Sequence, residues 1–281
     1  MLNKRGLIGF TLVLMSAWLT GCATSPYQGE GKTKSDALLK VQLSSAEKTL
    51  VAQSPPRLIF AGFAMHSQSK AFRNDVLSAE KVALAVDPSA VIFKLDNPAS
   101  GQDADWPYAT NENIAQVLKK IGGLARPQDK VMVLLATHGN VNALGVNFAN
   151  QNYPHLDSAF LNRAMAELRG KPVMVVMSAC HSGSFLPLLA GPSRVVIAAA
   201  AADRSSFGCQ FHSTNTYFID ALFNQTAPHE QSMVKLMDKA KTDVDLREKK
   251  LKLPPSMPAM SVGAAVKEWA NQPLKNWMNV Q

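Results

Sequence analysis

The stretch VMVVMSACHSGSF, residues 173–185, joins an uninterrupted apolar run to a short polar turn that contains a cysteine and a histidine. A second stretch, VMVLLATHGN at 131–140, has the same form and ends on His138 and Gly139. Short continuous apolar runs of this kind are typical of strands that are buried on both faces of a parallel sheet. The two stretches therefore predict neighbouring internal strands of an α/β protein.

The rest of the chain repeats this alternation of apolar runs with helical patterns. Strands are expected at 57–64, 90–95, 131–137, 173–179 and 194–202, with a last strand within 254–263. Helices are expected at 69–86, 111–123, 156–169, 214–223 and 232–251. Strands that alternate with helices indicate βαβ units. The sequence thus predicts a single three-layer sandwich, with a mostly parallel central sheet and helices on both faces.

The N-terminus has the pattern of a secretory signal. Lys4 and Arg5 precede an apolar run over 7–19, which is too short to span a bilayer, and the run ends in Leu-Thr-Gly-Cys at 19–22. That ending resembles the bacterial lipobox, which implies cleavage before Cys22 and attachment of lipid to this cysteine. By the same resemblance, the alanine after Cys22 implies an outer-membrane lipoprotein in the envelope of a Gram-negative bacterium. The alternative is an ordinary signal peptide with an incidental cysteine.

The predicted domain organisation follows from these segments. Residues 1–21 are the lipoprotein signal peptide, and 22–56 hold a lipid-anchored tether and a leader helix that Pro55-Pro56 closes. Residues 57–281 form the main domain. The net charge is +8 at pH 7, but the basic residues are scattered and are not interleaved with aromatic residues. No nucleic-acid partner is therefore expected.

Two reactive side chains follow two of the predicted strands. His138 and Cys180 are each expected at the first position after an apolar strand, 42 residues apart, which leaves room for one helical crossover. The carboxyl ends of parallel strands meet at one edge of a sheet, where α/β proteins place their reactive crevice. An imidazole beside a thiol can activate it as a nucleophile. The backbone N–H groups of Gly139 and Cys180 could hold an oxyanion, so the chemistry needs no metal or cofactor.

The motifs around these residues resemble those of the caspase–hemoglobinase superfamily, and legumain-type cysteine peptidases most closely. The similar segments are ATHGN (136–140), SACHSGSF (178–185), IAAAAADRSSFGCQ (197–210), KAFRND (70–75) and PSMPAMSVG (255–263). The resemblance implies a caspase-like fold and cysteine-type endopeptidase activity by a Cys180–His138 dyad. It also implies that Arg73 helps form the primary substrate pocket. His181 is then a wall of that pocket, and Ser205 and Ser206 bind substrate.

Several positions depart from the legumain pattern. Ser178 and His181 stand where legumains carry acidic residues, and Ala71 stands where they carry an asparagine. The acidic pocket residue further along aligns loosely with Asn215. The resemblance therefore implies the dyad and the fold, but it does not imply cleavage after asparagine.

Other interpretations of the cysteines and histidines remain open at the level of sequence. Cys180 could be a buried small hydrophobic residue or could form a disulfide with Cys209, and His138 could be purely structural. Cys209 and His212 have C-x-x-H spacing and could bind zinc together with Cys180 and His181. His181 could serve as the base in place of His138, although adjacent residues usually point apart.

The predicted function is therefore that of a lipid-anchored cysteine-type peptidase that hydrolyses peptide bonds. Its expected partners are a peptide or protein substrate and the membrane, which it reaches through Cys22. The alternatives are a catalytically degenerate envelope lipoprotein that binds peptides or proteins, and a transpeptidase that uses the same dyad with an amine in place of water.

Overall fold

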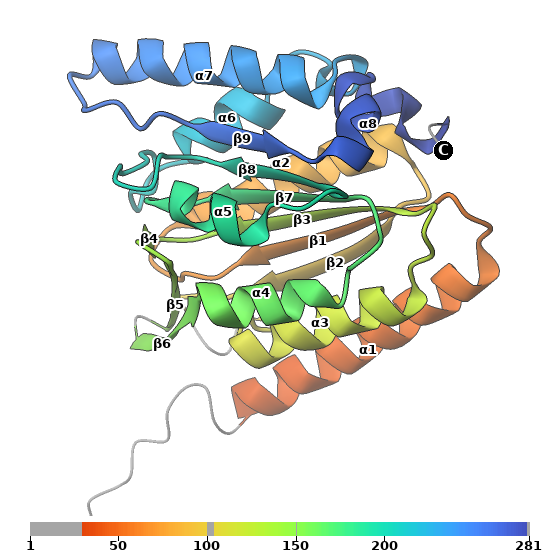
Figure 1. The fold of residues 1–281 in the computed structure, drawn as a ribbon. Helices are drawn as coiled ribbons and strands as arrows, with labels where there is room; N and C mark the ends of the chain where they lie inside the picture. The colour runs from red at the N-terminus through yellow and green to blue at the C-terminus, as the bar shows by residue number, and fades with distance from the viewer. Residues whose placement is uncertain (1–29, 100–103, 150, 280–281) are drawn as a thin grey trace, which may run out of the picture.

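The structure is a computed structural model and describes residues 30–99, 104–149 and 151–279 (Figure 1). The predicted signal peptide, the lipid attachment at Cys22 and the first part of the tether lie outside the described residues. Within the described part of the chain, every helix is too short or too polar to cross a membrane.

A six-stranded sheet forms the centre of the described domain (Figure 1). Five of its strands are parallel, and β9 runs antiparallel to its neighbour β8. In order across the sheet, the strands are β2 (Val91–Asp96), β1 (Leu58–Ala64), β3 (Lys130–Ala136), β7 (Val173–Ser178), β8 (Arg194–Ala198) and β9 (Ala259–Val262). The predicted α/β class, with a mostly parallel sheet, is confirmed.

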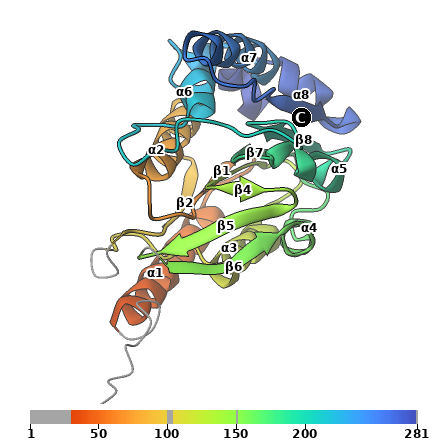
Figure 2. The same cartoon turned by 90° about the vertical axis from the view of Figure 1, so that its left-hand side faces the viewer.

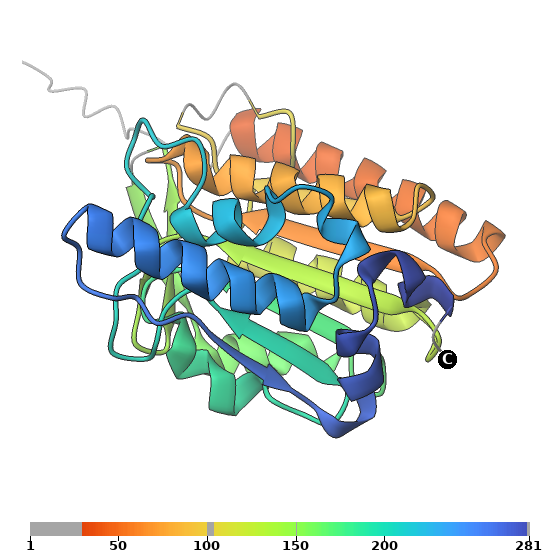
Figure 3. The same cartoon turned by 90° about the horizontal axis from the view of Figure 1, so that it is seen from above.

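Helices cover both faces of this sheet, as predicted. One face carries α1 (Glu30–Ala52), α3 (Asn111–Leu124), α4 (Ser158–Ala166) and α5 (Leu186–Leu189). The other carries α2 (Lys70–Val86), α6 (Tyr217–Phe223), α7 (Met233–Lys250) and α8 (Lys267–Asn271), which Figure 3 shows lying over the strands. Short 3₁₀ turns complete the chain at Ser182–Phe185, Pro228–Glu230, Ala264–Val266 and Leu274–Asn279.

The apolar runs of the strands explain the two-sided burial. Every residue of β1, β3 and β7 is buried, and successive side chains of a strand point to opposite faces. In β3, Val131, Val133 and Leu135 pack against the α1 and α3 face. Met132 and Leu134 pack against the α2 and α6 face. A continuous apolar run is therefore what this position in the sheet requires.

Several predicted boundaries were wrong by a few residues. The strand expected over 194–202 ends at Ala198, because the following alanines leave the ladder: Ala200 accepts a hydrogen bond from Gly183 N–H, and Ala201 donates one to Ser256. The strands expected to end at 137 and 179 end at Ala136 and Ser178. His138 and Cys180 are thus two residues beyond their strands rather than one.

A second, three-stranded antiparallel sheet was not predicted. It consists of β4 (Gly139–Asn140), β5 (Ala143–Phe148) and β6 (Gln151–Asp157) and lies across the carboxyl edge of the main sheet (Figure 2). Its sequence is short, rich in asparagine and without a long apolar run, so it has the composition of a loop. The following helix begins at Ser158, capped by Asp157, and not at 156.

The first helix is longer than expected and belongs to the same core. It begins at Glu30, inside the segment predicted as a tether. Its Leu39, Ala46 and Leu50 are buried in the core between the helix and the main sheet. Because the core includes these side chains, α1 packs as part of the domain that follows it.

Candidate active site

The ends of β3 and β7 lie side by side. The two strands pair in parallel with Ala136 opposite Ser178, and Thr137 N–H donates a hydrogen bond to the Ser178 carbonyl at 3.1 Å. The ladder ends at this pair, and His138 and Cys180 each follow two residues later in the chain. Neighbouring strands are about 4.8 Å apart, so both residues leave the sheet at one edge. This shared edge was predicted from the two apolar stretches.

Gly139 occupies a space that admits no side chain. A β-carbon at this position would lie 2.2 Å from the carbonyl oxygen of Cys180 and 3.0 Å from the Ala179 Cβ. The first distance is shorter than real Cβ contacts reach, and the second is tighter than most of them. Glycine at 139 is therefore what permits the backbone after His138 to approach the backbone of Cys180.

The Cys180 thiol contacts the residue Ser206. Its Sγ lies 3.3 Å from the Ser206 amide nitrogen, 3.7 Å from the Ser206 hydroxyl and 3.4 Å from the Ser206 carbonyl oxygen. The amide and hydroxyl are donors to sulfur, whereas the carbonyl accepts from the protonated thiol. Ser206 therefore offers the sulfur two donors and one acceptor, and the structure places this predicted substrate residue against the thiol. Ser205 is exposed beside it.

The turn after Cys180 is held in a specific shape. His181 has a left-handed backbone with φ of 55°, its N–H donates to the Arg204 carbonyl at 2.7 Å, and its ring Nδ1 lies 3.1 Å from the Ala202 carbonyl. Positive φ is uncommon outside glycine, asparagine, aspartate and histidine. His181 thus faces the loop that carries Ser206.

The His138 ring is packed among aromatic side chains. It meets the ring of His66 at a centroid distance of 4.5 Å and the ring of Phe72 at 5.1 Å, both edge to face. Its carbonyl accepts a hydrogen bond from Gly145 N–H at 2.8 Å, which ties His138 to β5. Burial lowers the pKa of His138, so the imidazole is uncharged and able to accept a proton at neutral pH.

His66 and Phe72 were not predicted as site residues. His66 follows the apolar strand β1 just as His138 follows β3 and Cys180 follows β7. The same signal, a polar side chain after a buried strand, could therefore have identified it.

A buried carboxyl group lies beneath the end of β7. Asp75, on α2, is fully buried. Its Oδ1 accepts from the backbone N–H of Thr216 at 3.0 Å and from Asn215 Nδ2 at 3.1 Å. Its Oδ2 accepts from the hydroxyls of Ser178 at 3.0 Å and Thr216 at 2.8 Å. Burial raises the pKa of Asp75 to about 7, opposed by these hydrogen bonds.

This group ties three elements together at the site: α2, the last residue of β7 and the cap of α6. Ser178 stands where legumains carry an acidic residue, and here its hydroxyl donates a hydrogen bond to a carboxylate on the neighbouring helix, that of Asp75. Asp75 was missed because the pattern of α2 was assigned by its apolar residues alone. The signal was a charged residue on the same helix face as Phe72 and Val76.

Arg73 is held at a different part of the edge. Its guanidinium forms ion pairs with Asp96 at 2.6 Å and Asp105 at 2.7 Å, and it lies 3.9 Å from the centre of the Trp106 ring. Asp96 ends β2, which is separated from β7 by β1 and β3. Three strand spacings correspond to about 14 Å. The structure does not bring these ion pairs next to Cys180, and the pocket role of Arg73 stays a prediction.

Cys180 and Cys209 are both free thiols in the structure. Burial raises the pKa of Cys209, with smaller contributions from the charges of Cys180 and Asp75. In the described part of the chain, no three His, Cys, Asp or Glu side chains gather closely enough to hold a metal ion.

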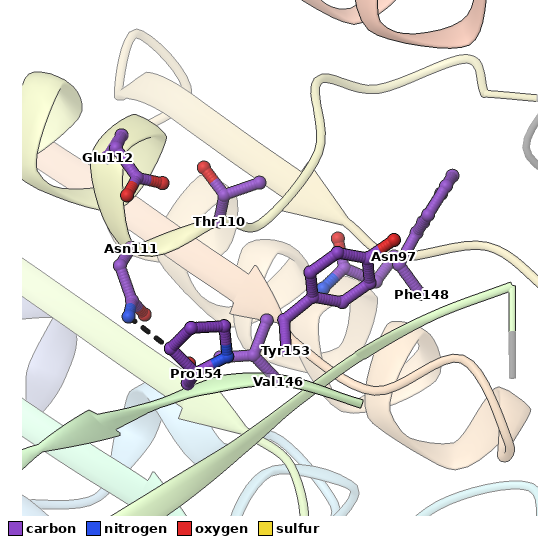
Figure 4. Close-up of a pocket in the computed structure, with 8 residues that line it drawn as sticks. All are labelled: Asn97, Thr110, Asn111, Glu112, Val146, Phe148, Tyr153 and Pro154. Carbon is purple, nitrogen blue, oxygen red and sulfur yellow. Dashed lines mark hydrogen bonds between the residues drawn. The ribbon is translucent and has the colours of Figure 1, made fainter. Parts of the chain in front are cut away.

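A separate cavity of about 110 Å³ lies behind β5 (Figure 4). Val146, Phe148 and Tyr153 form its apolar side, and Glu112 lies near its opposite wall. Gly145 precedes Val146 in β5 and lies on the opposite face of the strand, toward His66 and the His138 carbonyl. The cavity therefore lies on the face of β5 opposite the His66 ring and the His138 carbonyl.

Comparison with protein families gives a match to the peptidase C13 family over residues 110–267, more than half of the chain. No curated protein matches the sequence. Among solved structures, the crystal structure of caspase-1 from Spodoptera frugiperda is similar at 15% sequence identity and a TM-score of 0.49, over 73% of this chain and 85% of that chain. Because the family match includes both strand ends and the loop that holds Ser206 against the thiol, the chain belongs to the peptidase C13 family.

Proposed function

We propose that the protein is a legumain-like cysteine-type endopeptidase in which Cys180 is the nucleophile and His138 is the general acid and base. Membership of the peptidase C13 family supports cysteine-type peptidase activity on a protein or peptide substrate. The observation that supports the assignment is the parallel pairing of β3 and β7 up to Ala136 and Ser178, because His138 and Cys180 each follow two residues after this pair. A half-buried, uncharged imidazole and a thiol at one sheet edge are the pair that nucleophilic catalysis requires.

The reaction begins when His138 takes the thiol proton and the Cys180 sulfur attacks the peptide carbonyl carbon. The carbonyl electron pair moves to oxygen, and the N–H groups of Gly139 and Cys180 hold this oxyanion. The tetrahedral intermediate then collapses, the C–N bond breaks, and His138 protonates the leaving amine. Water, deprotonated by His138, attacks the thioester, and the thiolate leaves to accept the proton again.

The substrate is proposed to lie along the loop after β8. Ser206 already contacts the thiol, Ser205 is exposed beside it, and His181 faces the same loop. These three residues are assigned to substrate binding together with Arg73. Because Arg73 is ion-paired at the β2 side of the edge, its assignment requires a substrate that extends across the strand ends.

We further propose that the mature protein is attached to the membrane by lipid on Cys22. The support is the sequence pattern of residues 1–23 alone. A lipid anchor would hold the peptidase in the bacterial cell envelope, at the outer membrane, without a spanning helix.

The test is digestion of a peptide library by the wild-type protein, by Cys180→Ala and by Cys209→Ala. Cys209 is the matched control, because it is a second free thiol near the site with no proposed role. We expect cleavage by the wild type and by Cys209→Ala, and none by Cys180→Ala. Cleavage by Cys180→Ala would contradict the assignment. Peptide binding without cleavage by the wild type would favour the binding protein, and newly joined peptides would favour the transpeptidase.

A further inference from the structure

His66 is a second histidine at the candidate site, more deeply buried than His138, and the mechanism above gives it no role. Its side chain is 7% exposed, and it lies two residues after the end of β1. Its ring meets that of His138 at a centroid distance of 4.5 Å and an interplanar angle of 88°. Two charged imidazoles at this separation would repel each other, so their contact needs at least one uncharged ring.

The backbone around His66 is fixed by both sheets. Met65 N–H donates to the Ala136 carbonyl at 3.0 Å, and the Met65 carbonyl accepts from Asn147 N–H at 3.0 Å. The same carbonyl accepts from Asn97 Nδ2 at 2.9 Å. His66 therefore stands on a segment that is bonded to β3, β5 and the end of β2, and its ring has a defined position.

Phe72 completes a cluster of three rings. It lies 5.1 Å from the His138 ring and 6.0 Å from the His66 ring, measured between centroids. Gly145 closes the side toward β5, since a β-carbon there would lie 3.6 Å from Cδ2 of His66. The His138 ring is thus packed against His66, from the segment after β1, and Phe72, from α2, while β5 lies against the His66 ring.

The protonation state of His66 suits this packing. Burial, followed by the charge of His138, lowers the pKa of His66 to about 4. The N–H of Gln68 points to its Nδ1 at 3.4 Å, which leaves the ring proton on Nε2. His66 is therefore uncharged at neutral pH, and it can remain beside His138 when His138 gains a proton during the reaction.

We propose that His66 is a positioning residue, which together with Phe72 holds the His138 imidazole in the orientation that exchanges protons with Cys180. His66 acts through His138 and does not itself contact the substrate. The proposal rests on the proposed function, because only a reacting His138 needs a fixed ring.

The test compares the full-length protein with His66→Ala, His66→Phe and His155→Ala, in which the exposed His155 is the matched control. Three quantities are measured: kcat and KM on a cleaved peptide, and the pKa of His138 from the NMR titration of its ring, assigned with His138→Gln. In His66→Ala, water reaches the ring, so the pKa of His138 should rise, and kcat should fall about 10- to 100-fold with little change in KM. His66→Phe should recover most of kcat, because it restores the ring contact.

A His66→Ala protein with the wild-type pKa of His138 and the wild-type kcat would overturn the proposal. A His66→Phe protein as impaired as His66→Ala would also overturn it, because ring contact would then not be the cause. Thermal unfolding of each variant excludes loss of folding. If the wild type cleaves no peptide, the proposed function fails, and the titration of His138 still decides whether His66 controls that ring.

Discussion

At the scale of single residues, the candidate site depends on side chains and backbone groups that are in close contact with other segments of the chain. The backbone of Gly139 lies so close to the Cys180 carbonyl that no side chain fits between them. Ser206 offers its N–H and its hydroxyl to the thiol, and Asp75 accepts a hydrogen bond from Ser178 at the end of β7. Each of these contacts joins segments that are distant in the sequence. Small changes at these positions should therefore have large effects.

Gly139→Ala should reduce peptidase activity by about 100-fold or more, because the added methyl group collides with the Cys180 carbonyl and displaces the backbone by an ångström or so. Gly123→Ala is the matched control, since a β-carbon there meets nothing within 4 Å. Activity of Gly139→Ala equal to that of Gly123→Ala would show that this close approach is not needed.

Asp75→Asn should change how stability depends on pH. The pKa of Asp75 is about 7 in the folded state against a usual value of 3.8, so the folded protein holds this proton more tightly than the unfolded chain. The free energy of unfolding therefore falls as pH rises from about 4 to about 7. Asparagine keeps an acceptor for the two N–H donors and offers its own N–H₂ to the hydroxyls of Ser178 and Thr216.

Urea unfolding at pH 4.5 and pH 8 measures this effect. The stability of Asp75→Asn relative to wild type should rise between the two pH values, whereas that of the exposed Asp203→Asn should not. The acid destabilisation from the lowered pKa of His66 is common to all three proteins and cancels in the comparison. If the free energies of unfolding of the wild type and Asp75→Asn differ by the same amount at both pH values, the raised pKa of Asp75 is contradicted.

At the scale of secondary structure, the helix α1 was predicted to be a leader outside the main domain, yet its apolar side belongs to the core. Leu50 is 1% exposed and its neighbour Val51 is 69% exposed. Its last turn is also bonded to the domain, because the Leu50 carbonyl accepts from the guanidinium of Arg57. The helix should therefore contribute to stability.

Leu50→Ala should lower the free energy of unfolding by about 2–5 kcal/mol, because it removes a buried side chain and leaves a cavity. Val51→Ala should change it by less than about 0.5 kcal/mol, because that side chain faces solvent. Chemical denaturation of both variants checks this. Equal effects of the two changes would mean that α1 does not share the core.

The elements of the main sheet could be predicted because buried parallel strands require continuous apolar runs, and β1, β3 and β7 have them. The sheet β4–β6 could not, since its strands lack continuous apolar runs, are partly exposed and are held by pairing with one another. His138 and Cys180 could be predicted as site residues because the apolar runs of β3 and β7 show where these strands end. Asp75 and Ser178 could not be paired, because their contact depends on how α2 lies on the sheet.

At the scale of the whole molecule, the two edges of the main sheet have different chemistry. At the amino edge, buried Arg57 and Asp129 form an ion pair that joins the starts of β1 and β3, and Arg57 also donates to the ends of α1 and α3. At the carboxyl edge, the described residues include two histidines, a thiol and a buried carboxyl group. The fold thus fixes the strands at one edge and presents reactive groups at the other.

The central claim is that this architecture makes His138 and Cys180 a working pair. Its most direct test is the rate at which iodoacetamide alkylates Cys180 near neutral pH, followed by mass spectrometry of the Cys180 peptide. The wild type and the exposed-histidine variant His155→Ala should react quickly at Cys180, much faster than at Cys209, and His138→Ala should react slowly. Equal rates of Cys180 alkylation with and without the His138 imidazole would contradict the account.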